Sequence, residues 1–192
     1  MGPSQLSTGV FRQATSFPID TDIVVGCLDG LDPRDQLFLR ALNSGIRTLS
    51  PCERAVVAPV TGHVAESVVE LMLDGLGWHV LWHFAGPGLH GVDLVFLTAD
   101  NRVVAVEVKG TLVSGRMARL SRREVEQMTA AWLDDPANPG MAELGLDSAD
   151  VYGAVVVVNF ADLIWRCALT ADFAVLHPVG TLDQLADLTW LT

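Results

Sequence analysis

Residues 91–110, which read GVDLVFLTADNRVVAVEVKG, constrain the fold of this chain more than any other stretch. An apolar run, a polar turn at 98–102 and a second apolar run follow one another, a pattern that predicts a β-hairpin. Because side chains alternate along a strand, Glu107 and Lys109 point the same way, and antiparallel pairing puts Asp93 roughly across from Glu107. Two carboxylates and an ammonium group should therefore meet at one end of a mostly buried sheet, where such groups are rare unless paired or metal-bound.

Lys109 is the only lysine in the chain, and arginine supplies every other permanent positive side-chain charge. Lysine offers a compact point charge with a tunable pKa, which arginine does not. The position therefore favours a role specific to lysine, and a Lys109→Arg exchange should not be conservative.

The composition is that of one ordinary folded domain: 192 residues, 50% of them hydrophobic. We expect residues 1–58 to form an N-terminal extension packed on the core, and residues 59–192 to form the functional domain. No apolar run reaches the roughly 20 residues of a membrane span, and the N-terminus lacks a secretory pattern. Cys27, Cys52 and Cys167 form no CxxC pair and are typical of reduced thiols, so we expect a cytoplasmic protein without membrane contact.

The formal net charge of −11 argues against a free-standing, high-affinity binder of duplex DNA, whose surface is usually basic. Contact with nucleic acid would require a bound divalent cation, a concentrated basic patch, or positive charge from a partner protein. A homodimer is a further possibility that the sequence leaves open.

The N-terminal extension carries only local structural signals. A β-prone run at 23–27 predicts a strand, and Asp32-Pro33 predicts the start of a helix that ends near Asn43. Ser50-Pro51 repeats the cap-then-proline signal for a short helical piece that should end before Pro59.

The order of elements becomes clear from Thr61, which is placed to cap a helix. The further expected elements are a strand at 78–84, the hairpin, a helix to about 133 opened by a Ser121–Glu124 capping box, strands at 151–160, 163–169 and 173–176, and a last helix capped by Thr181 with Gln184. The core order helix, strand, strand, strand, helix, strand predicts a mixed α/β sandwich with the hairpin at its centre.

A helix that carries a Glu, then an Asp, then Glu107-Val108-Lys109 in this αβββαβ order resembles the PD-(D/E)XK, or restriction-endonuclease-like, nuclease superfamily. The resemblance covers residues 61–160 and is nearest in pattern to the Holliday-junction-resolvase-like and Mrr-like members. It implies a central mixed sheet flanked by helices. The residues carried over as catalytic are Glu66, Asp93, Glu107, Lys109 and Gln127. The proline of the family name is absent, since the sequence reads Gly91-Val92-Asp93.

The resemblance implies a metal-dependent endonuclease that hydrolyses DNA, with RNA as a second possible substrate. Asp93, Glu107 and the Val108 carbonyl would bind Mg²⁺ or Mn²⁺, which prefer hard oxygen ligands. Glu66 would hold a second metal or a metal-bound water. Lys109 would orient or deprotonate the attacking water or stabilise transition-state charge.

The only concentrated basic patch follows the motif directly. Arg116, Arg119, Arg122 and Arg123 are the expected donors to substrate phosphates, and the last two lie at the start of the second core helix. The same cluster is also consistent with a solvated loop or with a surface for an acidic partner protein.

Plainer interpretations stay open for each site residue. Asp93, Glu107 and Lys109 would serve equally as a buried ion-pair network without metal. Glu66 shares a helix face with Glu70 and Asp74 in what resembles a solvated acidic stripe, and Gln127 suits an exposed helix face. The alternative function is a catalytically inactive binding or scaffold subunit of a larger nucleic-acid-processing or defence complex, and a structural or immunity-type protein is a third class.

Overall fold

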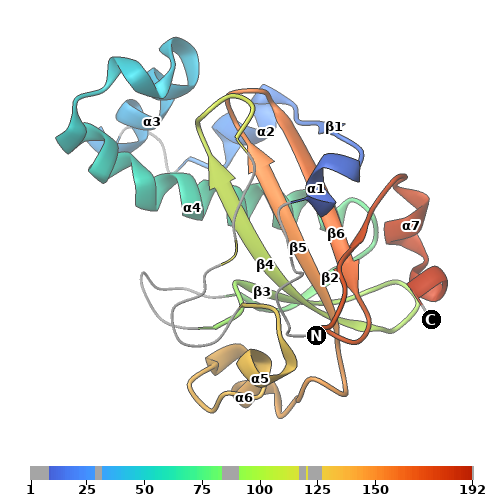
Figure 1. Ribbon diagram of the computed structural model, residues 1–192. Helices are drawn as coiled ribbons and strands as arrows, with labels where there is room; N and C mark the ends of the chain where they lie inside the picture. The colour runs from blue at the N-terminus through green and yellow to red at the C-terminus, as the bar shows by residue number, and fades with distance from the viewer. Residues whose placement is uncertain (1–8, 29–31, 84–90, 117–119, 121–126, 192) are drawn as a thin grey trace.

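The computed structural model describes residues 9–28, 32–83, 91–116, 120 and 127–191, and its centre is a seven-stranded sheet (Figure 1). The strands lie in the order β1-β6-β5-β4-β3-β2, and β7 pairs with β6. All neighbours are antiparallel except β4 and β5, which are parallel. The strand bounds are β1 Phe17–Pro18, β2 His79–His83, β3 Leu94–Leu97, β4 Val103–Thr111, β5 Tyr152–Asn159, β6 Ile164–Thr170 and β7 His177–Pro178. The predicted mixed α/β architecture, a sheet flanked by helices, is confirmed at this level.

Helices cover both faces of the sheet, and each face has its own hydrophobic core. The helices are α1 Val10–Gln13, α2 Thr21–Gly26, α3 Pro33–Ser44, α4 Pro51–Asp74, α5 Ala130–Leu133, α6 Pro139–Leu144 and α7 Asp183–Ala186, with 3₁₀ turns η1 Ile46–Thr48 and η2 Leu188–Leu191. On the α4 face, Val64 and Val68 pack with Val106 and Val156. On the opposite face, which carries α5 and α6, Met128 and Trp132 pack with Ala105 and Val155.

The long helix α4 corrects one expectation. Ser50 caps it, and Ser50 and Glu53 exchange the hydrogen bonds of a capping box. The helix then continues through Pro59 to Asp74, whereas the sequence predicted an end before Pro59 and a new start at Thr61. Instead of capping, the buried Thr61 hydroxyl donates to the Val57 carbonyl one turn earlier, at 2.9 Å. The apolar face buried along the helix outweighs the hydrogen bond that Pro59 removes.

By length and composition alone, α4 would suit a membrane span. A helix that covers a sheet in a protein core has the same composition, and Ala65, Val68 and Val69 are fully buried here. The far end of α4 packs against α3, where Phe38 is fully buried, and Figure 1 shows this pair projecting beyond the sheet.

Other local predictions divide into confirmed and wrong ones. The helix after Asp32, the hairpin, β5 with its partner β6, and the reciprocal Thr181–Gln184 hydrogen bonds are confirmed. The strand predicted at 23–27 is wrong: α2 lies there, because the Asp20 side chain caps it by accepting the Asp22 N–H.

Two more predictions fail at residues with positive φ. The strand predicted at 173–176 does not form, because Phe173 has φ 55° and the Asp172 carboxylate accepts the N–H groups of Ala174 and Val175. The helix predicted up to residue 133 does not include Met128, whose φ is 60°, and α5 starts only at Ala130. The predicted capping box at Ser121 and Glu124 lies outside the described residues.

Candidate functional site

The site lies where β4 loses one of its two neighbours. The hairpin register pairs Leu94 with Val106, and β3 begins at Leu94. Beyond that pair, Asp93 bonds to β4 twice. Its backbone N–H donates to the Val106 carbonyl at 3.1 Å, and its side-chain Oδ2 accepts the Val108 N–H at 2.7 Å. Asp93 therefore lies across from Glu107, as the sequence predicted.

Glu107 is the most buried charged group of the site, with 1% of its surface exposed. It projects on the α5–α6 face, since its neighbour on β5 is Val155 and Ala105 packs on the same side. Its Oε1 pairs with the Lys109 ammonium and accepts a hydrogen bond from Gln127 Nε2 at 2.6 Å. Its Oε2 is buried and accepts no hydrogen bond from any described residue. An acceptor left unpaired in this way is costly unless a further donor or a cation binds it.

Burial dominates the electrostatics of the two facing carboxyls. The pKa of Glu107 is raised to about 8, chiefly by burial and next by the negative charge of Asp93, against the lowering effects of Lys109 and Gln127. Burial also raises the pKa of Asp93, against the lowering effects of Lys109, the Val108 N–H and His83. The pair therefore does not carry two negative charges at neutral pH without additional positive charge nearby.

Glu66 reaches the site from the other face of the sheet. The helix α4 lies directly against β4 at Gly110, where an added Cβ would stand 2.6 Å from the Thr61 carbonyl oxygen and 2.9 Å from the Ala65 Cβ. Glu66 is the next residue of the helix. The pKa of Glu66 is raised to about 7, chiefly by burial and next by the negative charge of Asp93, against the lowering effect of Lys109. Asp93 thus interacts electrostatically with both Glu66 and Glu107 and joins the two faces of the sheet.

Gln127 lies at the site by a route that the sequence did not predict. It is not on a helix but immediately precedes Met128, whose φ is 60°. The fully buried Met128 packs into the core of the α5–α6 face, on the same side as Glu107. This turn brings the Gln127 amide onto Glu107.

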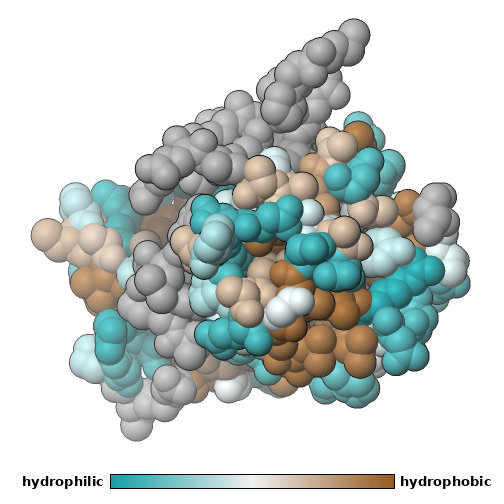
Figure 2. All heavy atoms as spheres, turned by 90° about the horizontal axis from the view of Figure 1, so that it is seen from below, coloured by the Kyte–Doolittle hydropathy of each residue, from teal (hydrophilic) through white to brown (hydrophobic). Residues whose placement is uncertain are grey.

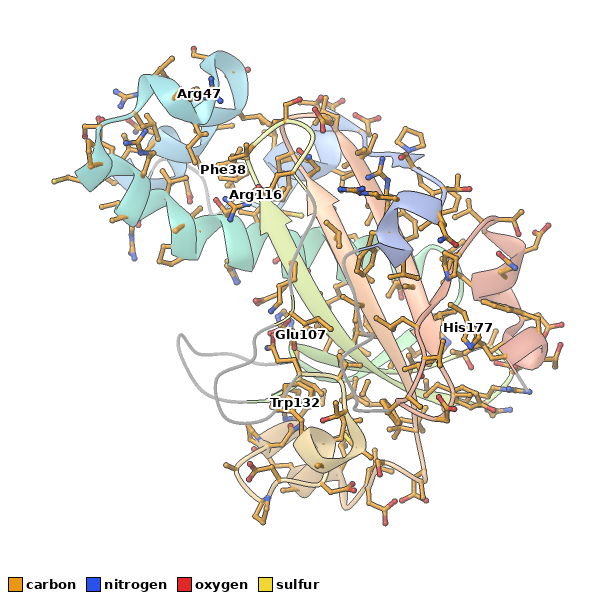
Figure 3. All side chains as sticks on the ribbon, viewed as in Figure 1. Phe38, Arg47, Glu107, Arg116, Trp132 and His177 are labelled. Atoms are coloured by element: carbon orange, nitrogen blue, oxygen red, sulfur yellow. The ribbon has the colours of Figure 1, made fainter. Side chains whose placement is uncertain are left out.

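The arginine cluster is described only at its start. Arg116 is exposed and follows the carboxyl end of β4, well along the strand from Glu107 in Figure 3. Its loop is fixed to β5, because Asn159 Nδ2 donates to the carbonyls of Val113 at 3.2 Å and Arg116 at 3.5 Å. Arg119, Arg122 and Arg123 lie outside the described residues. Figure 2 shows the molecule from below, the end away from Arg116, where hydrophilic residues border an apolar area.

Sequence reasoning missed two groups at the site. His83, the last residue of β2, contacts Glu70 and Glu66 on α4. The buried Asn138 accepts the Val92 N–H at 3.3 Å and so fixes the backbone next to Asp93. The only available signals were a histidine that ends a β-prone run and an Asn-Pro helix start, and neither is specific.

The site offers two carboxylates and one backbone carbonyl to a small hard cation. Within the described ranges, no group of three or more His, Cys, Asp or Glu side chains is arranged to hold a metal ion. What remains is the Asp93–Glu107 pair with the buried, unpaired Oε2 and the adjacent Val108 backbone. Mg²⁺ keeps several waters and needs only one or two carboxylates, so this donor set is sufficient for it.

No protein-family model, no curated protein and no solved structure matches this chain. The chemistry of the site is therefore inferred from its own residues.

Proposed function

We propose that this protein is a metal-dependent endonuclease of the PD-(D/E)XK type that hydrolyses phosphodiester bonds of DNA. The observation that carries the proposal is Glu107, a fully buried carboxylate with one unpaired oxygen, opposite Asp93 and two residues from the only lysine. The order α4, β2, β3, β4, then the short helices α5 and α6, then β5, with β4 and β5 parallel, supports it as well.

The two carboxylate oxygens of Glu107 have different partners. Lys109 and Gln127 both bind Oε1, which leaves Oε2 for a cation. Asp93, Glu107 and the Val108 carbonyl would hold Mg²⁺ or Mn²⁺. When bound, such an ion lowers the pKa of water and neutralises phosphate charge.

Lys109 is the residue placed to handle the attacking water. Its side chain is 28% exposed, so the ammonium can reach a substrate while its stem stays fixed in the sheet. It would orient the water or stabilise charge on the phosphoryl group. Glu66 approaches Asp93 from α4 and would hold a second cation or a water there.

The test compares purified wild type with single variants on plasmid, linear, branched and single-stranded DNA, and on RNA, with Mg²⁺ or Mn²⁺. Glu107→Ala should abolish cleavage, and Lys109→Arg should slow it by about 10²-fold or more, because a point charge of tunable pKa is lost. Thermal unfolding of each variant checks that the fold survives. Equal behaviour of wild type and variants on every substrate would reject a nuclease.

A second candidate is a binding or scaffold subunit of a larger nucleic-acid-processing complex. The net charge of −11 and the lack of a three-ligand group among the described residues favour it. Calorimetry decides between the two, since a nuclease binds Mn²⁺ and an inactive subunit of this kind does not.

A further inference from the structure

His83 stands between two carboxylates of α4. Its Nδ1 lies 2.8 Å from Glu70 Oε2, and its Nε2 lies 3.9 Å from Glu66 Oε2. Both are ion-pair contacts, and the one with Glu70 is much the shorter. The imidazole thus addresses a different carboxyl with each nitrogen.

A β-bulge aims the ring at this face of the sheet. Val80 pairs with Phe96, but Trp82 pairs with Val95 and His83 with Leu94, so Leu81 is an extra residue. Phe96 and Leu94 belong to the α4 core, whereas Val95 belongs to the opposite core. Regular alternation from Val80 would have put His83 on the α5–α6 face, away from Glu66. Bulges re-aim side chains in this way and are common beside functional sites.

The helix supplies the matching spacing. Glu66 and Glu70 are four residues apart on α4, so they lie one turn apart on one face. Glu70 is the more exposed of the two, with 35% of its side chain accessible against 19% for Glu66. The short contact of Nδ1 with the outer carboxylate holds the ring, and the ring's other nitrogen then faces the inner carboxyl, which interacts electrostatically with Asp93.

We propose that Glu70 and His83 form a positioning pair that orients the Glu66 carboxylate toward Asp93 and so raises the affinity of the site for a divalent cation. The inference rests on the proposed metal site. Groups that orient a ligand through its second contact commonly change metal affinity by about 10- to 100-fold. The pair explains both why the strand is bulged and why an acidic stripe on α4 faces a histidine.

Calorimetric titration of Mn²⁺ into the full chain tests the proposal without any cleavage assay. His83→Ala should weaken binding by about tenfold or more. A glutamine amide nitrogen reaches close to the position of Nε2, and an asparagine amide close to Nδ1. His83→Gln keeps a donor toward Glu66 but loses the contact with Glu70, so it should recover part of the affinity, and His83→Asn should recover less. The matched control is His79→Asn, an exposed histidine on the same strand, which should bind as wild type does.

A double-mutant cycle gives the second readout. Glu70→Ala should weaken Mn²⁺ binding in the same direction, and the Glu70→Ala/His83→Ala double variant should be no weaker than His83→Ala alone, because the two act as one unit. Unchanged affinity in His83→Ala, or recovery by asparagine instead of glutamine, would overturn the inference while the metal site stands. Failure of the wild type to bind Mn²⁺ would instead reject the proposed function itself. Should His83→Ala not fold, the glutamine and asparagine variants still decide the matter.

Discussion

The two halves of β4 belong to one strand but do different work. Val104, Ala105 and Val106 are fully buried and lie between β3 and β5. From Glu107 onward the strand continues beside β5 but has no partner in β3, whose first residue, Leu94, pairs with Val106. The first half is apolar on both faces, as expected for a strand buried on both sides. The second half carries the charged side chains, so the site forms where the sheet loses a strand.

The absence of a β3 partner beside Glu107 also explains how groups on the two faces of the sheet interact. Glu107 and Gln127 lie on the α5–α6 face, whereas Glu66 and His83 lie on the α4 face. A continuous sheet would keep these groups apart. At the start of β3 the Asp93 carboxylate replaces a backbone partner of β4 and interacts with both sides.

The largest predicted effect falls on the paired half and should leave the site intact. Phe96 is fully buried across from Val104, with its ring edge-on to Trp78 at 5.8 Å between centroids. Phe96→Ala should lower the free energy of unfolding by about 3–5 kcal/mol, as measured by urea denaturation. Under conditions where the variant is folded, its Mn²⁺ affinity should match wild type, and Phe96→Leu should lose less stability. A loss of Mn²⁺ affinity in the folded Phe96→Ala protein would mean that scaffold and site are not separable.

The paired half is also what the sequence predicts well. Alternation along a strand has a period of two, so a single turn position fixes the register, and Asp93 opposite Glu107 follows from counting. The valine run of β5 was equally predictable, because a β-branched run of this length is typical of a strand buried on both faces.

The rest of the site depends on local departures from regular structure. Leu81 inserts one residue into β2 and reverses which face His83 occupies. Met128 adopts φ 60° and turns Gln127 onto Glu107. No glycine or proline marks either the bulge at Leu81 or the turn at Met128. Tertiary packing, and not local propensity, imposes these two departures, so the sequence gives no local sign of them. The same holds for Pro59, which a buried apolar face keeps inside α4.

An intermediate effect should appear in the pH dependence of stability. The Glu107 carboxyl titrates near its ordinary value of 4.5 when unfolded but at about 8 when folded. Between these values unfolding releases a proton, so the metal-free protein should lose stability as pH rises from about 5 to about 8, on the order of 3 kcal/mol. Glu107→Gln should flatten this fall and be more stable than wild type at pH 8.

Mg²⁺ sharpens the same measurement. At pH 8 it should raise the melting temperature of wild type by neutralising the carboxylate pair, and it should not raise that of Glu107→Gln. Asp74→Asn, an exposed position on α4, is the control and should follow wild type throughout. A Glu107→Gln protein as pH-sensitive as wild type would show that the paired and unpaired halves do not differ electrostatically.

The smallest predicted effect tests the far end of the unpaired half. Arg116 is exposed beyond β4, and Asn159 of β5 fixes its loop through the backbone carbonyls, so the side chain is free to meet a phosphate while its anchor stays rigid. Arg116→Ala should weaken nucleic-acid binding several-fold and reduce the slope of log affinity against log salt by about one, with the rate of the chemical step unchanged. Arg12→Ala, an exposed arginine on α1, should change neither quantity. A slower chemical step in Arg116→Ala with an unchanged salt slope would mean that this end of β4 acts on the Glu107 centre, and that the unpaired half is a single site along its whole length.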